Sequence, residues 1–192
     1  MSPRTTLQLQ QIRETKKQVI LDAALKVFAT SGFKGATIHL IAKEAGIAKG
    51  LLYSYYKSKE ELLEELILYG LNKAVSFMDE MPGGIPDSKE SFALGVRAMV
   101  NLFVAESDFW RLYSMVLLQT NMAERFRSLI EAFLKQYLEV YLVYFRNKGS
   151  SNPFGEAMLF GAVLDGMMFD LLVAPGEYPV ESVMEMVIEK FA

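Results

Sequence analysis

The stretch that decides the fold is Thr37-Ile-His-Leu-Ile-Ala-Lys-Glu-Ala-Gly-Ile-Ala-Lys-Gly-Leu-Leu-Tyr-Ser-Tyr-Tyr56. It is typical of two short helices, about 37–45 and 48–56, with Gly46 between them. Glycine adopts the left-handed conformation that a sharp exit from a helix requires. The side-chain oxygen of Thr37 can accept a backbone hydrogen bond and cap the first helix. Two short helices joined by a glycine turn indicate a helix-turn-helix.

Apolar residues three and four apart predict which side of each short helix is buried. In the first helix the inward residues are Ile38, Ile41, Ala42 and Ala45. In the second helix Leu52 and Tyr56 face inward, and the opposite face carries Lys49, Gly50, Tyr53 and Ser54. A glycine inside a helix costs about 1 kcal/mol relative to alanine. Gly50 is understandable if this outer face must approach a groove wall closely.

The rest of the chain also shows helical periodicity. Ser58 and Glu61 form a capping box that opens a long helix, Pro82–Pro86 is the clearest break, and Asp87 with Glu90 resembles a second capping box. The nine expected helices span about 11–30, 37–45, 48–56, 58–81, 87–106, 109–119, 122–147, 155–173 and 180–191. We therefore predict an all-α chain with a three-helix helix-turn-helix domain over 1–60 and a helical ligand-binding and dimerisation domain over 61–192.

Charge is divided unevenly between these two parts. Residues 1–59 hold ten Lys and Arg against three Asp and Glu, a net charge of +7, whereas residues 60–192 carry −10. A basic amino-terminal part followed by an acidic part indicates that only residues 1–59 bind a polyanion. Lysines that are merely exposed to solvent would give the same difference in charge.

Composition excludes several classes of protein. With no cysteine there are no disulfides or thiolate metal sites, and a single histidine, His39, leaves little for a histidine metal centre or a catalytic triad. No apolar run reaches the roughly 18 residues of a membrane span. The amino end lacks the apolar block of a signal peptide. We expect a cytoplasmic protein that uses neither a metal nor a cofactor.

Five segments, in their order and spacing, resemble the amino-terminal domain of the TetR family of transcriptional repressors. They are Ile20-Leu-Asp-Ala-Ala-Leu-Lys-Val-Phe28, Gly32-Phe33, Gly35-Ala-Thr37, Ile41-Ala-Lys-Glu-Ala-Gly-Ile47 and Lys49-Gly-Leu-Leu-Tyr-Ser-Tyr-Tyr-Lys-Ser-Lys-Glu-Glu-Leu62. The resemblance covers about residues 18–66. It implies a homodimeric repressor that binds a palindromic operator on double-stranded DNA and is released by a small molecule.

The resemblance also assigns DNA-binding roles to individual residues. It makes 48–56 the recognition helix, with Lys49, Gly50, Tyr53 and Ser54 at positions that approach bases or phosphates. Thr37 and His39 match positions that often touch the DNA backbone, and Tyr55, Lys57 and Lys59 match positions that grip phosphates. Ala48 departs from the usual hydroxyl cap and Leu51 from the usual small residue, so the operator sequence is not readable.

In the body, the resemblance implies an inducer pocket and a dimer interface on the last two helices. Aromatic residues on three successive segments are the candidate ligand contacts: Phe103, Trp110, Tyr113, Tyr137 and Tyr141. The candidate interface residues, at intervals suited to helix pairing, are Met158, Ala162, Gly166, Phe169, Val183 and Val187. The charge of −10 favours an apolar, neutral or cationic inducer of unknown identity. Asp165 and Asp170 fit ligand contacts or, with acids nearby, a proton-coupled site, and Asp165 equally fits a surface position on an amphipathic helix.

Two rival functions remain open from the sequence. One is a helical ligand carrier or enzyme with an incidental basic head, although no partner carboxylate can be paired with Asp165 or Asp170. The other is a DNA-binding protein of the same fold without an inducer. We predict a ligand-responsive regulator and not an enzyme.

Overall fold

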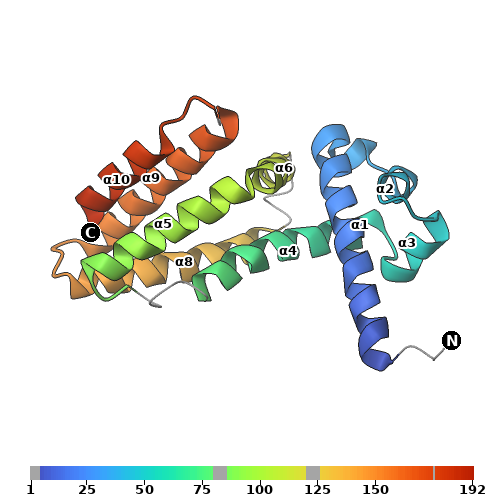
Figure 1. Cartoon of the computed structure of the whole chain (residues 1–192), viewed down its shortest axis with the longest axis horizontal. Helices are drawn as coiled ribbons and strands as arrows, with labels where there is room; N and C mark the ends of the chain where they lie inside the picture. Colours follow the sequence, from blue (N-terminus) through green and yellow to red (C-terminus); the bar gives the residue numbers. More distant parts are fainter. Residues whose placement is uncertain (1–4, 80–85, 120–125, 175) are drawn as a thin grey trace. The chain divides into compact units, whose positions relative to one another are not determined.

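A computed structural model describes residues 5–79, 86–119, 126–174 and 176–192. This part of the chain contains nine helices and no strand, as predicted (Figure 1). The helices are α1 (Thr6–Gly35), α2 (Ile38–Glu44), α3 (Lys49–Tyr55), α4 (Lys59–Asp79), α5 (Lys89–Ala105), α6 (Ser107–Leu117), α8 (Arg127–Asn147), α9 (Pro153–Val173) and α10 (Val180–Phe191). No helix among the described residues is long and apolar enough to cross a membrane.

The chain divides into two compact units, residues 1–70 with 112–123 and residues 71–111 with 124–192. The division falls inside α4, whereas the predicted boundary at residue 60 separates functional domains and stays a prediction. The reason lies in the first half of α4, where Leu62, Leu63, Leu66 and Ile67 are fully buried. We call the first unit the head and the second unit the body.

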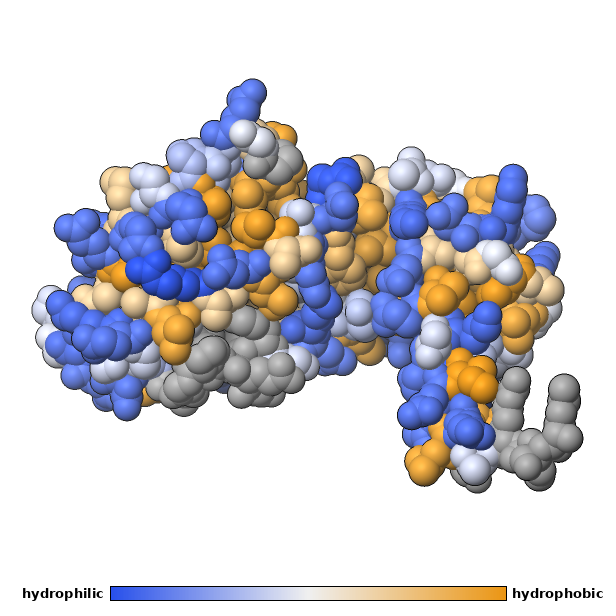
Figure 2. Space-filling view, in the orientation of Figure 1, coloured by the Kyte–Doolittle hydropathy of each residue, from blue (hydrophilic) through white to orange (hydrophobic). Residues whose placement is uncertain are grey.

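The head is built on α1, and only the second half of that helix belongs to its core. Ile20, Ala24 and Phe28 are fully buried, whereas Leu7 and Ile12 are exposed and lie outside the core. Figure 2 shows hydrophobic residues among hydrophilic ones at the surface of this amino-terminal part of α1.

The carboxyl end of α1 is kinked and held from outside the helix. Gly32 has φ 66°, which breaks the helix where Ser31-Gly32 predicted its end, although helical structure resumes as far as Gly35. The side chain of Gln119, which follows α6, makes hydrogen bonds on both sides of this kink. It donates to the carbonyl of Phe28 at 2.9 Å and accepts from the amide of Phe33 at 3.0 Å.

The predicted local signals of the helix-turn-helix are confirmed. Thr37 caps α2 by accepting from the amide of Leu40 at 3.2 Å, and Gly46 has φ 64°. Ser58 accepts from the amide of Glu61 at 3.1 Å, and the Glu61 carboxylate accepts in return from the amide of Lys57 at 2.6 Å.

The second predicted capping box is wrong by one residue. Ser88, not Asp87, caps α5, and its partner is Ser91 instead of Glu90. The Pro82–Pro86 break and the predicted start of a helix at 122 lie largely outside the described residues.

The body packs its helices around an aromatic core. Phe92 of α5 stacks on Tyr144 of α8 with ring centroids 4.4 Å apart, and Phe160 of α9 lies 5.1 Å from Phe92. Within this unit α9 packs against α8 and α10, and α10 packs against α5 (Figure 1). The buried aromatic rings of this core contribute to the body's stability through burial and ring–ring contacts.

Candidate nucleic-acid interface and ligand pocket

The inward residues of α2 and α3 hold the two helices against the rest of the head. Ile41 and Leu52 are fully buried, Ala42 is 2% exposed and Tyr56 is 3% exposed, in agreement with the prediction. The hydroxyl of Tyr56 is buried and finds no hydrogen-bond partner among the described residues, and burial together with the nearby Glu65, Glu14 and Glu61 raises its pKa to about 12. With this side buried, the opposite face of α3 is left to solvent.

The outer face of α3 is exposed along its length. Tyr53 is 47% exposed, and the ammonium of Lys49 lies 5.7 Å from the centroid of its ring. Ala48 provides no side-chain cap, so the first amides of α3 keep hydrogen-bonding capacity for an external acceptor such as a phosphate. Ser54 donates to the carbonyl of Leu51 at 2.6 Å, which leaves its oxygen able to accept.

Gly50 is not required by the packing of the head. A Cβ added at this position would meet nothing within 4 Å, and its backbone is ordinary helix. The absence of a side chain is therefore unexplained by intramolecular contacts. The remaining explanation for Gly50 is the one drawn from the sequence, that the outer face of α3 must come close to another surface.

Most of the other predicted DNA-binding residues are exposed beside α3. Thr37, His39 and Lys57 are exposed. Tyr55 is half-buried, with the guanidinium of Arg13 5.8 Å from its ring centroid. Sequence reasoning counted Arg13 in the basic head but did not single it out, because its neighbour Tyr55 is 42 positions away in the chain.

Lys59 does not belong to this exposed face. Its ammonium donates to the carbonyls of Phe33 at 2.8 Å and Ala36 at 3.2 Å, and it lies 4.4 Å from the Phe33 ring centroid. The side chain therefore neutralises the carboxyl end of α1, where helix carbonyls lack partners. That Lys59 grips a phosphate stays a prediction, with two of its three ammonium hydrogens already used inside the head.

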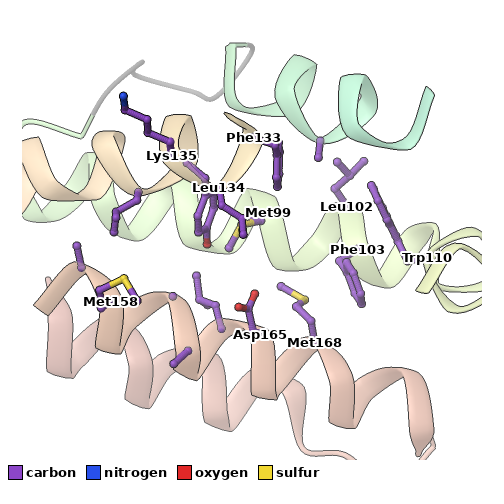
Figure 3. A pocket seen from close by; sticks show the side chains of 17 residues that line it. Met99, Leu102, Phe103, Trp110, Phe133, Leu134, Lys135, Met158, Asp165 and Met168 are labelled. Atoms are coloured by element: carbon purple, nitrogen blue, oxygen red, sulfur yellow. The ribbon is translucent and has the colours of Figure 1, made fainter. Parts of the chain in front are cut away.

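The body contains a cavity of about 560 Å³. Its walls come mainly from α5, α8 and α9, with Ala74 of α4 and Trp110 of α6, and they are largely apolar (Figure 3). Three of the predicted ligand contacts line it, namely Phe103, Trp110 and Tyr137. The rings of Phe103 and Trp110 stack with centroids 5.8 Å apart.

The other two predicted ligand contacts lie elsewhere. Tyr113 is buried in the head, where its hydroxyl donates to the carbonyl of Ile67 at 2.8 Å and its ring covers Gly70. Tyr141 is 2% exposed in the body core, and burial raises its pKa to about 12. The structure does not bring either residue to the cavity wall.

Polar groups on the cavity wall are few. The carboxylate of Asp165 points from α9 into the space that α5 and α8 enclose (Figure 3). Asp165 is exposed to solvent, and the partial burial of its carboxyl raises the pKa of that group. The hydroxyl of Tyr137 is hydrogen-bonded to that of Tyr141, and the pKa of Tyr137 lies well above the usual value because of burial, of Tyr141 and of the negative charge on Asp165.

The candidate dimer residues separate into two groups. Met158 and Phe169 are 51% and 57% exposed, and Ala162 and Gly166 are also exposed, although Met158 and Ala162 line the cavity as well. Val183 packs partly against the body core.

Val187 is 4% exposed and lies within the core of a single chain, which corrects its assignment to an interface. The exposed apolar residue on this part of α10 is instead Met186, at 66%. The intervals of three and four that placed Val187 on a helix face describe core packing equally well.

In the head, α1, α2 and α3 pack together, and α3 presents an exposed face with a lysine and a tyrosine. This is the arrangement of a helix-turn-helix DNA-binding protein. Residues 20–66 match the sequence pattern of the bacterial regulatory proteins of the tetR family. The chain belongs to the TetR family of transcriptional regulators.

Characterised and solved relatives agree with this assignment. The fatty acid metabolism regulator protein of Bacillus subtilis (strain 168) is 30% identical over 128 residues, which cover 67% of this chain and 65% of that protein. The uncharacterised regulator YhgD of the same organism is 40% identical over 65 residues, which make up 34% of each chain. The matches thus cover less than two thirds of these relatives' own lengths.

Solved structures show the same fold over nearly the whole chain. A TetR-like transcriptional regulator from Rhodococcus sp. RHA1 superimposes with a TM-score of 0.73 and 22% identity, covering 98% of this chain and 95% of that one. FadR from Bacillus subtilis, solved in complex with stearoyl-CoA, has a TM-score of 0.71 and 24% identity, covering 91% and 96%.

Proposed function

We propose that this protein is a homodimeric transcriptional repressor that binds a palindromic operator and leaves it when a small molecule enters the body. The observation that carries the proposal is the apolar cavity of about 560 Å³ in a chain whose head belongs to the TetR family. Cavities of this size and polarity are typical of small-molecule sites. A carrier or an enzyme with an incidental head would have no need of the exposed face of α3.

DNA binding is assigned to the outer face of α3. Lys49 supplies a charge that neutralises phosphate, the uncapped amides after Ala48 supply donors, and Tyr53 supplies an exposed ring. Two such helices in a dimer enter successive major grooves when they lie about 34–36 Å apart. We assign the contact between subunits to the exposed apolar residues of α9 and α10, among them Phe169 and Met186.

Release from DNA follows from a difference in ligand affinity between two arrangements of the dimer. A ligand shifts such an equilibrium only by the factor by which it binds one arrangement more tightly. The helices α4 and α6 each contribute residues to both units, and α6 carries Trp110 on the cavity wall and Tyr113 in the head core. We propose these two helices as the route by which ligand binding reaches the head, in a protein that acts in the cytoplasm.

Binding to the DNA immediately upstream of the chain's own coding sequence tests this function. Fluorescence anisotropy at several salt concentrations should show tight binding of that fragment, with log K falling linearly against log salt. Lys49→Ala should weaken binding, whereas the matched control Lys190→Ala, at an exposed position on α10, should not. Equal binding of the upstream fragment and a scrambled fragment, with no effect of Lys49→Ala, would favour the carrier or enzyme.

A further inference from the structure

The polar groups on the cavity wall accept hydrogen bonds more readily than they donate them. Among the described residues that line the cavity, Asp165 is the acidic one; it is exposed, and its carboxylate points from α9 into the space between α9 and the helices α5 and α8 (Figure 3). An ionised carboxylate accepts hydrogen bonds and has none to donate. Among the described residues, no hydrogen bond or ion pair engages this carboxylate.

Tyr137 adds a second acceptor to the same wall. Its hydroxyl is hydrogen-bonded to Tyr141 in the core, and because a hydroxyl oxygen has two lone pairs it keeps acceptor capacity in that bond. The oxygen lies close enough to Asp165 for the carboxylate charge to act on it. Asp165 and Tyr137 therefore form an acceptor-rich position in an otherwise apolar cavity.

The cation that lines the cavity is directed away from this position. Lys135 of α8 is exposed, and Figure 3 shows its nitrogen at the outer edge of the cavity, far from the Asp165 carboxylate. Phe103, Trp110 and Phe133 instead present aromatic surfaces, and the faces of aromatic rings attract cations. The body itself, residues 71–111 with 124–192, carries a net charge of −6, which also attracts cations toward it.

We propose that Asp165 makes this cavity selective for an apolar molecule that carries an amine, whose ammonium group donates hydrogen bonds to the Asp165 carboxylate. The proposal rests on the cavity being the ligand site of the proposed function, and it names the chemical class of that ligand. An anionic acyl compound would place its negative charge or its hydrocarbon chain against the Asp165 carboxylate, and both placements are unfavourable. The pocket thus differs in its preference from what the stearoyl-CoA complex of FadR would lead one to expect.

The test compares four dodecyl compounds that share one chain and differ in the polar end. The full-length protein is titrated with 1-dodecylamine, 1-dodecanol, dodecanoate and dodecanoyl-CoA, each below its critical micelle concentration. Binding is followed by the emission of Trp110, the single tryptophan, which lines the cavity. We expect dodecylamine to bind at least about tenfold more tightly than dodecanol, as a charge-assisted hydrogen bond allows, and dodecanoate to bind most weakly.

Variants assign the preference to the carboxylate. In Asp165→Asn the affinity for dodecylamine should fall to that for dodecanol, while the affinity for dodecanol stays within about threefold. Asp165→Glu should keep the preference for the amine. The matched control is Asp170→Asn, because Asp170 is an exposed acid on the same helix that does not line the cavity. Circular dichroism confirms that each variant keeps the helical fold of the parent.

Each possible result decides the proposal. Tighter binding of dodecanoate or dodecanoyl-CoA than of dodecylamine, an unchanged preference in Asp165→Asn, or no binding of dodecylamine at all would overturn it. Release of the upstream DNA fragment is measured in parallel. If the amine binds through Asp165 but does not release the DNA, the inference is supported and the proposed function is contradicted. If only an acyl compound releases the DNA, the proposed function is supported and the inference is contradicted.

Discussion

The head and the body differ in how far apart in sequence the partners of each key residue lie. In the head, Thr37 and Ser58 are paired with amides three residues away, and Gly46 acts through its own backbone angle. In the body, the charge of Asp165 on α9 acts on Tyr137 of α8, 28 positions away in the chain, and the cavity is lined by residues from Ala74 to Met168. The comparison teaches that the DNA-binding face is encoded locally, whereas the ligand site is encoded by packing.

The largest expected effect separates the body core from its surface at two adjacent positions of α10. Val187→Glu would bury an unpaired charge in the core, which should cost several kcal/mol, about 3 or more, and unfold the body. Met186→Glu changes a residue that is 66% exposed and should leave the folded subunit nearly as stable. Thermal unfolding measures both variants.

Light scattering on Met186→Glu then tests the assigned dimer contact. Dissociation to folded monomers is expected, because a charge is placed at an apolar contact. A stable dimer of this variant would move the interface away from α10. A folded Val187→Glu protein would contradict the placement of Val187 in the core.

Two lysines of the head should respond in opposite ways to removal. Lys59→Ala takes away two charge-assisted hydrogen bonds to the carboxyl end of α1 and should lower the free energy of unfolding by about 1.5–3 kcal/mol. Lys49→Ala should leave that free energy within about 0.5 kcal/mol and make the slope of log K against log salt shallower by about 0.9. Chemical denaturation and salt-dependent anisotropy separate the two roles. If Lys59→Ala were as stable as the parent protein, the assigned role of Lys59 in holding the carboxyl end of α1 would be contradicted.

Two glycines offer a sharper version of the same contrast. A Cβ at Gly70 would lie 2.2 Å from the Tyr113 ring, so Gly70→Ala should destabilise the head by about 1–3 kcal/mol through overpacking. Gly50→Ala meets open space and should stabilise α3 by up to about 1 kcal/mol. If α3 approaches a groove wall closely, Gly50→Ala should nevertheless bind operator more weakly. Unfolding curves and operator affinity for both variants decide this, and full operator affinity of Gly50→Ala would leave Gly50 without a role in DNA binding.

The smallest expected effect concerns the buried hydroxyl of Tyr56. Its pKa of about 12 in the folded head lies above the ordinary 10.0, so its neutral form contributes stability that is complete below pH 10 and is lost as the pH rises through 12. Because phenylalanine has no hydroxyl to ionise, Tyr56→Phe should lose less of its free energy of unfolding than the parent protein as the pH rises from 10 to 12. At neutral pH it should change the free energy of unfolding by less than about 1 kcal/mol, because the hydroxyl has no hydrogen-bond partner to lose. Denaturation of both proteins between pH 9 and pH 12 provides the measurement, and identical pH profiles would be the contrary result.

Much of the fold and of the DNA-facing surface was predictable because the signals are short-range. A helix cap acts over three residues and an inward stripe over four, so Thr37, Gly46, Leu52 and Tyr56 can be placed without knowing the tertiary structure. The cap of α5 shows the limit of such signals. Asp87 and Ser88 are both good capping residues, and only the geometry of the backbone chose Ser88.

The surroundings of the aromatic residues on α6 were decided by the tertiary structure alone. Trp110 and Tyr113 are three residues apart on α6, yet one lines the cavity and the other covers Gly70 in the head. Periodicity places both near one face of the helix but does not say what that face meets along its length. The same holds for Val187, whose spacing fits an interface and a core equally well.

The sequence by itself determined an all-helical chain, a basic helix-turn-helix head and the outward face of α3, because these follow from contacts within a few residues. The tertiary structure decided that Lys59 closes the end of α1, that Val187 is core, and that Asp165 points into an apolar cavity. The physical reason is that a polar or apolar side chain takes its role from the groups that surround it. For these residues those groups come from segments far away in the chain.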